Sequence, residues 1–329
     1  MSRQPFGSRR PLPTYWPRLQ GNTSALSVLD FGAVGDGDGN GGGTDNAAAL
    51  QAAIDAAQVQ GRALFIPVGR FMVNSTLVVG CSEIAITCPS CPPVKGCAAH
   101  GPPLEPLRMF GEDRFFSIIA TIQPLHAVIE FASAPPGAAN AGGTSNHELS
   151  EFTVDGGGLN GHFGTVVLLH SPPTSGDFNR DREWVSALLQ YTGMPGLNAC
   201  VKRPAGCAQA NFSIYARSIT KSTFRSLNVI NTKIACMSLA YGWINRVTDC
   251  HFTQCFIGLH LWDQANNADI FQNNFDGIFG VPIIIEQAAQ VNIEGNVIEG
   301  NAGPGIVASS VDGLTISSNY FEVRLQSLC

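Results

Sequence analysis

Acidic side chains recur at one spacing in the C-terminal third of the chain. Asp263 and Glu286 lie 23 residues apart, and each is followed by Gln. Asp276, Glu299 and Glu322 form a second series with the same spacing. Two carboxyl groups that face one glycosidic bond can supply a proton donor and a base or nucleophile, and their separation selects the stereochemical outcome. Stacked like charges also raise the pKa of one member of such a series, as a general acid requires.

Aromatic and imidazole side chains accompany both series. His260 and Trp262 alternate with Leu259 and Leu261, so they are expected to face outward beside Asp263. An exposed Trp next to a carboxylate is a platform for a sugar ring. We therefore predict Asp263 and Glu286 as catalytic residues, with carboxyl groups roughly 5 Å apart if they lie on neighbouring strands. His260 and Trp262 are the predicted substrate-binding residues of this site.

The second series is the alternative site. Asp276, Glu299 and Glu322 each follow a large apolar residue and should point outward. His251 and Tyr320 lie two residues before positions of this series and share its face, which makes them substrate-binding candidates. A simple solvated strand face remains an open explanation for either series, because outward polar residues are the normal state of a strand.

The element that must position these side chains is an internal repeat of 23 residues over 222–322. Its apolar columns are Phe224, Val247, Ile270, Ile293, Ile316 and Val229, Phe252, Phe275, Ile298, Phe321. Alternating apolar residues and polar corners indicate short strands, and so short a unit must stack on its neighbours to bury its apolar face. The repeat predicts an all-β fold, a single-stranded parallel β-helix. Asn273, Asn296 and Asn319 should line one corner, where Asn tolerates left-handed backbone and can hydrogen-bond between coils.

Composition limits the partners. The 329 residues carry a net charge of −6, which argues against nucleic acid or an anionic membrane as the main partner. No apolar run reaches the ~18 residues of a membrane span. Clustered cysteines at 81–97 and 200–207 favour disulfides and an extracellular or secretory location, whereas Cys236, Cys250 and Cys255 are expected to be small core residues. The first 25 residues nevertheless lack the apolar core of a signal peptide.

The region 27–79 carries a family signature, SVLDFGAVGDG followed by GTDNAAALQAAIDAA and GRALFIPVGRF. It resembles the N-terminal part of the pectate lyase superfamily, the rhamnogalacturonase and epimerase-like group in particular. The resemblance implies a right-handed, pectin-lyase-like β-helix whose N-terminal end is closed by a helix at 44–57. Thr44 or Asp45 is the expected N-cap of that helix, and a short strand is expected at 63–66. It also implies work on polysaccharides.

The resemblance makes the leading function a glycoside hydrolase acting on a pectin-like or acidic polysaccharide. The motifs of known members are missing: Asn231-Thr232 is followed by Lys233, and Gly-His-Gly does not occur. A non-catalytic glycan-binding or structural β-helix, like an adhesin or tailspike, and a polysaccharide lyase therefore remain alternatives. No metal ligands and no cofactor are predicted, with calcium required only by a lyase. The segment Asp36-x-Asp38-x-Asn40-Gly41 resembles half a calcium loop, but Ala47 replaces its final Glu.

The predicted organisation is an irregular arm at 1–25 and one β-helix domain at 26–329. The coils run from about residue 60 to 322, and an insertion at 156–211 is expected to overhang the catalytic face and form a groove. Asp155 before this insertion is assigned to a turn. The polysaccharide is the expected partner of a monomer or homotrimer. No cap for the last coil is visible in the sequence, so we expect further coils or a partner there.

Overall fold

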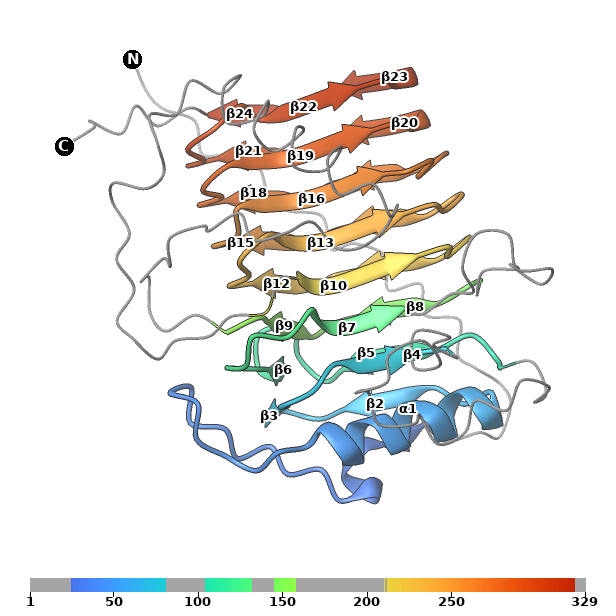
Figure 1. Ribbon diagram of the computed structural model, residues 1–329, viewed down its shortest axis with the longest axis vertical. Coiled ribbons are helices and arrows are strands. Elements are labelled where there is room, and N and C mark those ends of the chain that lie inside the picture. Colours follow the sequence, from blue (N-terminus) through green and yellow to red (C-terminus); the bar gives the residue numbers. More distant parts are fainter. Residues whose placement is uncertain (1–24, 81–103, 132–144, 158–209, 211, 323–329) are drawn as a thin grey trace, which may run out of the picture.

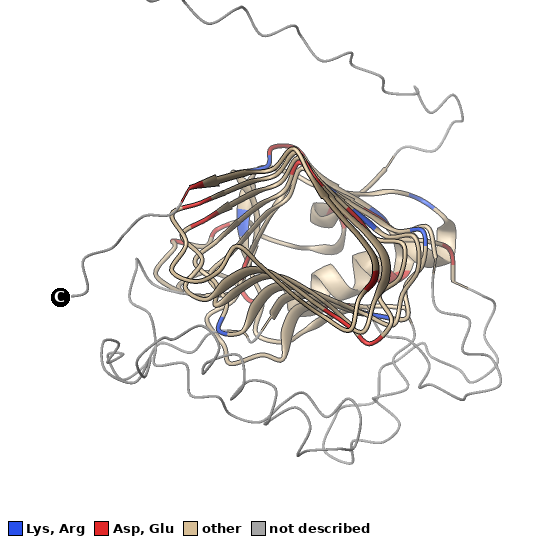
Figure 2. Ribbon diagram, turned by 90° about the horizontal axis from the view of Figure 1, so that it is seen from above, with Lys and Arg blue, Asp and Glu red and all other residues tan. Residues whose placement is uncertain are grey.

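The computed structural model describes residues 25–80, 104–131, 145–157, 210 and 212–322. Its strands form three parallel sheets, and the chain visits the sheets in turn as it climbs (Figure 1). This is the predicted right-handed parallel β-helix, with the hand that right-twisted strands favour in parallel crossovers. Viewed along the axis, the three sheets enclose the interior (Figure 2). Within the described ranges, no helix has the length and apolar character of a membrane span.

Sheet A begins one coil earlier than expected, because β1, which precedes residue 60, pairs with β2, which follows it. Its strands in spatial order are β1 Leu26–Ser27, β2 Leu64–Ile66, β5 Arg108–Gly111, β8 Glu148–Ser150, β11 Thr223–Arg225, β14 Arg246–Thr248, β17 Asp269–Phe271, β20 Ala289–Glu294 and β23 Asp312–Ser317.

Sheets B and C complete each coil. Sheet B contains β3 Gly69–Met72, β6 Ser117–Ala120, β9 Thr153–Asp155, β12 Asn228–Ile230, β15 His251–Thr253, β18 Asn274–Asp276, β21 Val297–Glu299 and β24 Tyr320–Glu322. Sheet C contains β4 Leu77–Val79, β7 Ala127–Phe131, β10 Phe212–Arg217, β13 Ala235–Ala240, β16 Ile257–Trp262, β19 Val281–Glu286 and β22 Ile306–Ser309.

The N-terminal end is closed by helix α1, Ala47–Gln60, preceded by the short 3-10 helix η1, Val28–Phe31 (Figure 1). Leu50, Ile54 and Ala57 of α1 are buried as their spacing predicts. The predicted N-caps are wrong, because Asn46 occupies that position without capping the helix through its side chain. The Asn46 side chain instead accepts from the Val34 amide and donates to the Val34 carbonyl, which ties the preceding loop to the helix start.

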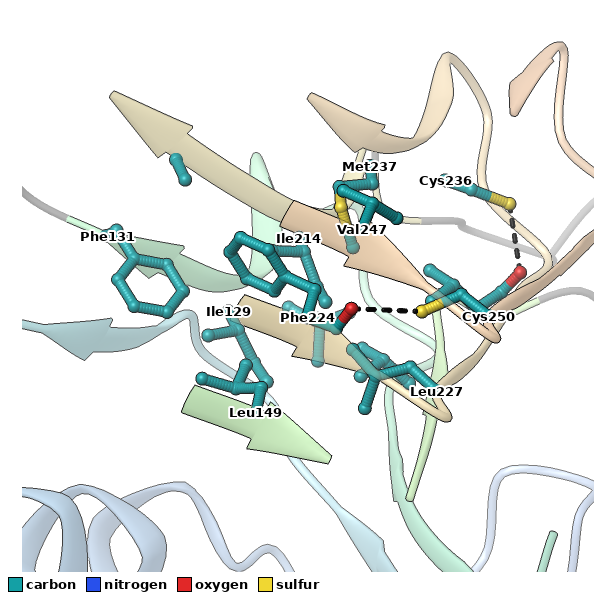
Figure 3. Packing of buried hydrophobic residues seen from close by; sticks show 14 of the residues in the cluster. Ile129, Phe131, Leu149, Ile214, Phe224, Leu227, Cys236, Met237, Val247 and Cys250 are labelled. Carbon is teal, nitrogen blue, oxygen red and sulfur yellow. Dashed lines mark hydrogen bonds between the residues drawn. The ribbon is translucent and has the colours of Figure 1, made fainter. Parts of the chain in front are cut away.

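The repeat columns become ladders inside the coil. Val247 pairs with Ile270 and Phe252 with Phe275, each at the predicted offset of 23. The Phe252 and Phe275 rings stack with centroids 4.8 Å apart. Figure 3 shows Phe224 and Val247 packed with other buried apolar side chains in the interior. Burial of a side chain of this size contributes ~2–3 kcal/mol, so the interior supplies the main stabilisation of the coil.

The Asn corner is confirmed as a hydrogen-bonded ladder. The Asn296 carboxamide oxygen accepts from the Asn273 backbone amide at 2.9 Å, and the Asn296 side chain donates to Asn319 at 2.8 Å. The left-handed residues are those just before the Asn, including Gln272 and Gly295, with φ of 54° and 67°. The Asn side chains thus satisfy the corner amides, while their neighbours make the turn.

One cysteine prediction is wrong. Cys236 and Cys255 are buried as expected, but a disulfide joins them across successive coils, and Cys250 is the free buried thiol among the described residues. The cysteine clusters at 81–97 and 200–207 lie outside the described residues, as does almost all of the insertion expected at 156–211.

Candidate functional site

The outer face of sheet C gathers polar and aromatic side chains of four successive coils. Strand register places Tyr215 between Glu130 and Ser238, and His260 beyond Ser238. A second column on this face contains Arg217, Ala240 and Trp262. Strand alternation sends these positions away from the interior because their neighbours, such as Leu239 and Leu261, belong to the inner core.

Trp262 and His260 form an aromatic pair at the centre of this face. Their rings are stacked, with centroids 5.7 Å apart and an angle of 10° between planes. The Trp262 indole donates a hydrogen bond to Ser238 Oγ at 3.0 Å, which fixes the orientation of the ring. The two predicted sugar-binding side chains therefore lie together and point outward.

Each predicted catalytic carboxyl group has a basic partner. Asp263 Oδ2 lies 2.7 Å from Arg217 Nη2, and Glu286 Oε2 lies 3.0 Å from His260 Nε2. The Arg217 guanidinium also lies over the Trp262 ring, 5.8 Å from its centroid. Polar contacts and ring stacking thus connect Asp263, Arg217, Trp262, His260 and Glu286 in one continuous cluster.

The expected register of Asp263 with Glu286 is wrong. In sheet C, Leu239 pairs with Leu261 at an offset of 22, and Leu261 pairs with Ile285 at an offset of 24. The cause is the corner between sheets B and C, which has three residues at 254–256 but four at 277–280. Asp263 is consequently displaced by one residue from Glu286, and it adopts left-handed backbone just after β16, with φ of 50°.

Sequence reasoning missed the N-terminal end of this face. Glu130 on β7 is half-buried beside Tyr215, and burial raises the pKa of the Glu130 carboxyl. Burial also raises the pKa of the Tyr215 phenol to about 12, although the nearby Arg217, which hydrogen-bonds it, works in the opposite direction. The His126 ring packs edge-on against Tyr215 with centroids 4.9 Å apart, and burial lowers its pKa. These residues lie outside the regular repeat, so no spacing marks them.

The second acidic series forms a true ladder on sheet B. Asp276 pairs with Glu299, which pairs with Glu322. His251 and Tyr320 share the neighbouring column, separated by Asn274 and Val297. His251 Nδ1 lies 3.1 Å from Asn228 Oδ1, and burial lowers the His251 pKa despite the nearby Asp276. Tyr320 donates to Glu322 at 2.8 Å. The members therefore lie in register, but His251 and Tyr320 are three coils apart.

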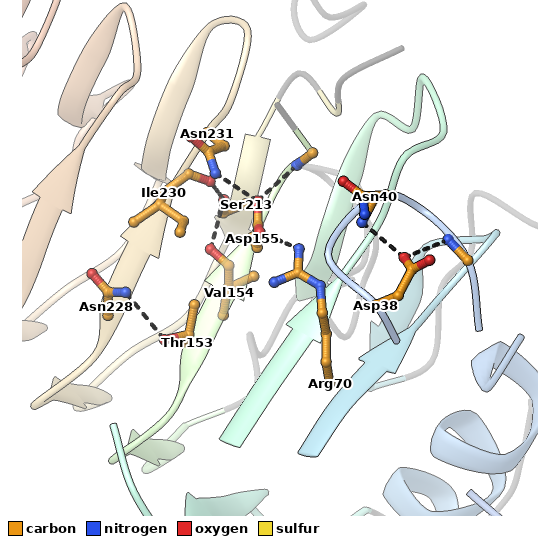
Figure 4. A network of polar contacts seen from close by, with 12 residues as sticks. Asp38, Asn40, Arg70, Thr153, Val154, Asp155, Ser213, Asn228, Ile230 and Asn231 are labelled. Atoms are coloured by element: carbon orange, nitrogen blue, oxygen red, sulfur yellow. Dashed lines mark hydrogen bonds and ion pairs between the residues drawn. The ribbon is translucent and has the colours of Figure 1, made fainter. Parts of the chain in front are cut away.

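Asp155 is more than a turn residue. It accepts from the Gly157 amide, as a turn residue does, but its carboxylate also pairs with Arg70 and accepts from the Asn231 side chain at 2.9 Å. Figure 4 shows this network joining β3, β9 and the corner after β12. The Asp155 side chain is only 5% exposed, so its ion pair with Arg70 is largely buried. The pair connects β9 with β3 and so links coils near the N-terminal end.

The partial calcium loop is internally satisfied. Asp36 accepts from the Thr44 amide and hydroxyl, and Asp38 accepts from the amides of Asn40 and Gly42. These bonds lower the pKa of both carboxyl groups. Among the described residues, three or more His, Cys, Asp or Glu side chains do not converge in any metal-binding arrangement.

The outer face of sheet C therefore has the parts that sugar chemistry uses. A stacked aromatic pair offers an apolar surface for a sugar ring. One carboxyl group contacts its His260 member, and the other pairs with the arginine over Trp262. Arg217 balances the charge of Asp263, while the His260–Glu286 pair can share and transfer a proton. Sheet B offers acidic side chains without a comparable ring pair among its described residues.

Family models match two parts of the chain. Residues 25–86 match the model described as "Rhamnogalacturonase A/epimerase, pectate lyase-like", and residues 206–324 match "Right handed beta helix region". No curated protein sequence matches the chain.

Similar solved structures share the fold at low identity. ORF18 of Geobacillus virus E2 gives a TM-score of 0.51 at 11% identity, with 89% of this chain and 50% of that chain covered. The catalytic unit of the GH87 α-1,3-glucanase from Streptomyces thermodiastaticus gives 0.44 at 11% identity, with coverages of 87% and 42%. The pre-mature gene product 12 of bacteriophage phi29 gives 0.45 at 13% identity, with coverages of 88% and 32%. The chain thus spans half or less of these proteins.

Proposed function

Because the chain folds as a pectate lyase-like right-handed β-helix domain, we propose that it is a glycoside hydrolase that binds a polysaccharide across the outer face of sheet C. The description of the model that matches residues 25–86 makes pectin-like polysaccharides the first substrate class to test. Fold and family alone leave the reaction open, since members of one fold perform different chemistries. The proposal therefore depends on the side chains of the face.

The observation that carries the proposal is the stacked His260–Trp262 pair, with one carboxyl group in contact with His260 and the other paired with the arginine over Trp262. Glu286 contacts His260 at 3.0 Å, and Asp263 binds the guanidinium that lies over Trp262. A sugar ring held against this pair would lie within reach of both carboxyl groups. This combination of platform and paired carboxyls is what glycosidic hydrolysis requires.

In the proposed reaction, the His260–Glu286 pair donates a proton to the glycosidic oxygen as the bond between that oxygen and the anomeric carbon breaks. Asp263, its charge balanced by Arg217, accepts a proton from the water that attacks the anomeric carbon. One water is consumed, and two chain ends are released. Each carboxyl group then returns to its starting protonation state by exchange with solvent.

A second function is favoured by one feature of the same face. Both carboxyl groups already have a basic partner. Ion pairs of this kind can order a surface without taking part in a reaction. The rival is a non-catalytic domain that binds glycans through His260 and Trp262.

A polysaccharide panel separates these functions. The full chain is incubated with pectin-like and neutral polysaccharides, and the products are assayed for new reducing ends and for the ultraviolet absorbance of unsaturated sugars. New reducing ends without absorbance support the hydrolase, and both signals together indicate a lyase. Binding without either signal supports the glycan-binding domain, and no binding to any polymer contradicts both proposals.

We also propose an extracellular or secretory location, which the Cys236–Cys255 disulfide supports because disulfides persist in oxidising compartments. Mass measurement in solution tests whether the protein is a monomer or a homotrimer. Thiol labelling of protein recovered from its native compartment tests the disulfide.

A further inference from the structure

Among the described residues, the outer face of sheet C carries few positive charges. Arg217 is the sole Lys or Arg in the seven strands of this sheet, all of which the structure describes. Against it stand the carboxyl groups of Glu130, Glu286 and the adjoining Asp263. The Arg217 guanidinium is already committed to Asp263 at 2.7 Å. It therefore has little remaining positive charge with which to attract an anionic substrate.

Among the described residues, no Lys or Arg forms an ion pair with the remaining acids. Glu286 contacts the His260 imidazole and no Lys or Arg in the part of the chain that the structure describes. Glu130 has no hydrogen bond or ion pair to any described residue, and it lies in register with Tyr215 in an apolar surrounding formed by Ala127, Phe212 and Tyr215. Within the described ranges, an ionised Glu130 thus has no cation that compensates its negative charge.

The charges belong to one site rather than to separate patches. The Tyr215 hydroxyl interacts electrostatically with Glu130, Arg217 and Asp263. Arg217 in turn lies over Trp262, the centre of the proposed sugar platform. A charged group on the ligand would therefore interact with the whole cluster through a partly buried, weakly screened environment.

We propose that the sugar bound on the His260–Trp262 pair is uncharged, either a neutral hexose or a methyl-esterified uronate, and that a free uronate is rejected. This inference rests on the proposed polysaccharide-binding function and narrows its substrate class. It replaces the acidic polysaccharide expected from the family resemblance. The physical reason is that a free uronate would add a carboxylate where the described side chains already carry excess negative charge.

The test compares two forms of one ligand. Homogalacturonan oligosaccharides of a single length are prepared as free acids and as methyl esters, and their binding to the full chain is measured by calorimetry at low and moderate salt. We expect the ester to bind at least about tenfold more tightly than the acid at low salt, a difference of about 1.4 kcal/mol. Added salt should strengthen binding of the acid and leave the ester unchanged, because it screens repulsion.

The variant Glu130→Gln identifies the source of the selectivity. It preserves the shape of the side chain, and we expect it to raise affinity for the acid severalfold without changing affinity for the ester. A matched control, Glu294→Gln on the outer face of sheet A, should change neither. Tighter or equal binding of the acid by the unaltered chain overturns the inference, as does an unchanged preference in Glu130→Gln.

The assay also separates this inference from the proposed reaction. If the ester binds but releases no reducing ends, the hydrolase proposal fails and the charge preference stands. If the acid is bound and cut in preference to the ester, the hydrolase stands and the charge inference fails. If neither oligosaccharide nor any neutral polysaccharide binds, both are wrong.

Discussion

Arg217 reaches Asp263 across two coils. Arg217 ends β10 and Asp263 follows β16, yet Nη2 and Oδ2 are 2.7 Å apart. The register places Ala240 of β13 between Arg217 and Trp262, and this small side chain leaves room for the guanidinium to pass. The ion pair thus depends on the alignment of three strands as well as on its two members.

Replacing Arg217 should cost measurable stability. Because the side chains of Arg217 and Asp263 are only 16% and 30% exposed, we expect Arg217→Gln to lower the free energy of unfolding by about 1 kcal/mol. The matched control is Arg246→Gln, whose ion pair with Asp269 is 60% and 44% exposed and should contribute almost nothing. Denaturant unfolding measures both, and equal losses would contradict the special role of Arg217.

The proposed carboxyl groups should be required for turnover. Asp263→Asn and Glu286→Gln preserve side-chain shape but remove the proton-accepting or proton-donating group, so each should lower kcat about 100-fold or more. The midpoint of thermal unfolding should change little in Glu286→Gln, and in Asp263→Asn it should fall only as far as in Arg217→Gln, because the same ion pair is lost. Asp269→Asn, an exposed residue on sheet A, serves as the control and should retain full activity. An unchanged kcat in either active-site variant would remove that residue from the mechanism.

The Asn ladder should be the most sensitive polar element of the coil. Asn296→Ala removes the acceptor of the Asn273 backbone amide and leaves this buried donor unpaired, while the Asn273 side chain keeps only its bond to the Val247 carbonyl. We expect a loss of about 3 kcal/mol in the free energy of unfolding. Asn292→Ala, on the outer side of β20, should stay within about 0.5 kcal/mol of the unaltered protein. Similar midpoints of chemical denaturation for the two variants would argue against the ladder.

His147 should make the fold sensitive to acid. Its Nδ1 accepts from the Leu107 amide, and burial lowers its pKa to about 4 from an ordinary 6.5. Between about pH 6.5 and pH 4, the unfolded chain therefore binds a proton at His147 and the folded chain does not. The free energy of unfolding consequently falls as pH decreases through this range. Acidification to below about pH 4 therefore lowers the free energy of unfolding by ~3 kcal/mol relative to neutral pH.

His147→Asn tests this origin of acid sensitivity, since Asn keeps an acceptor near Nδ1 but does not titrate. Unfolding free energies measured across pH 4–7 should show a flatter profile for the variant than for the unaltered chain. Parallel profiles would assign the acid sensitivity to other groups.

The sequence by itself determined the coiled fold and two of its three sheets, A and B. The 23-residue columns of Val247 and Phe252 appear as ladders in sheets A and B, and Asn273, Asn296 and Asn319 form the predicted corner. This worked because strand alternation and the length of the corner between sheets A and B are local properties that recur unchanged from β14 to β24. The helix at the N-terminal end was also visible, although Asn46 rather than Thr44 or Asp45 stands at its start.

Only the tertiary structure decided which side chains meet on sheet C. A corner of three residues at 254–256 and one of four at 277–280 shift the register by one residue in opposite directions, which separates Asp263 from Glu286. Arg217 and Glu130 join the face from coils with no regular spacing, and Cys236 meets Cys255 only when the coils stack. Contacts between coils depend on the summed length of every intervening corner, whereas a strand or a turn depends on its own few residues.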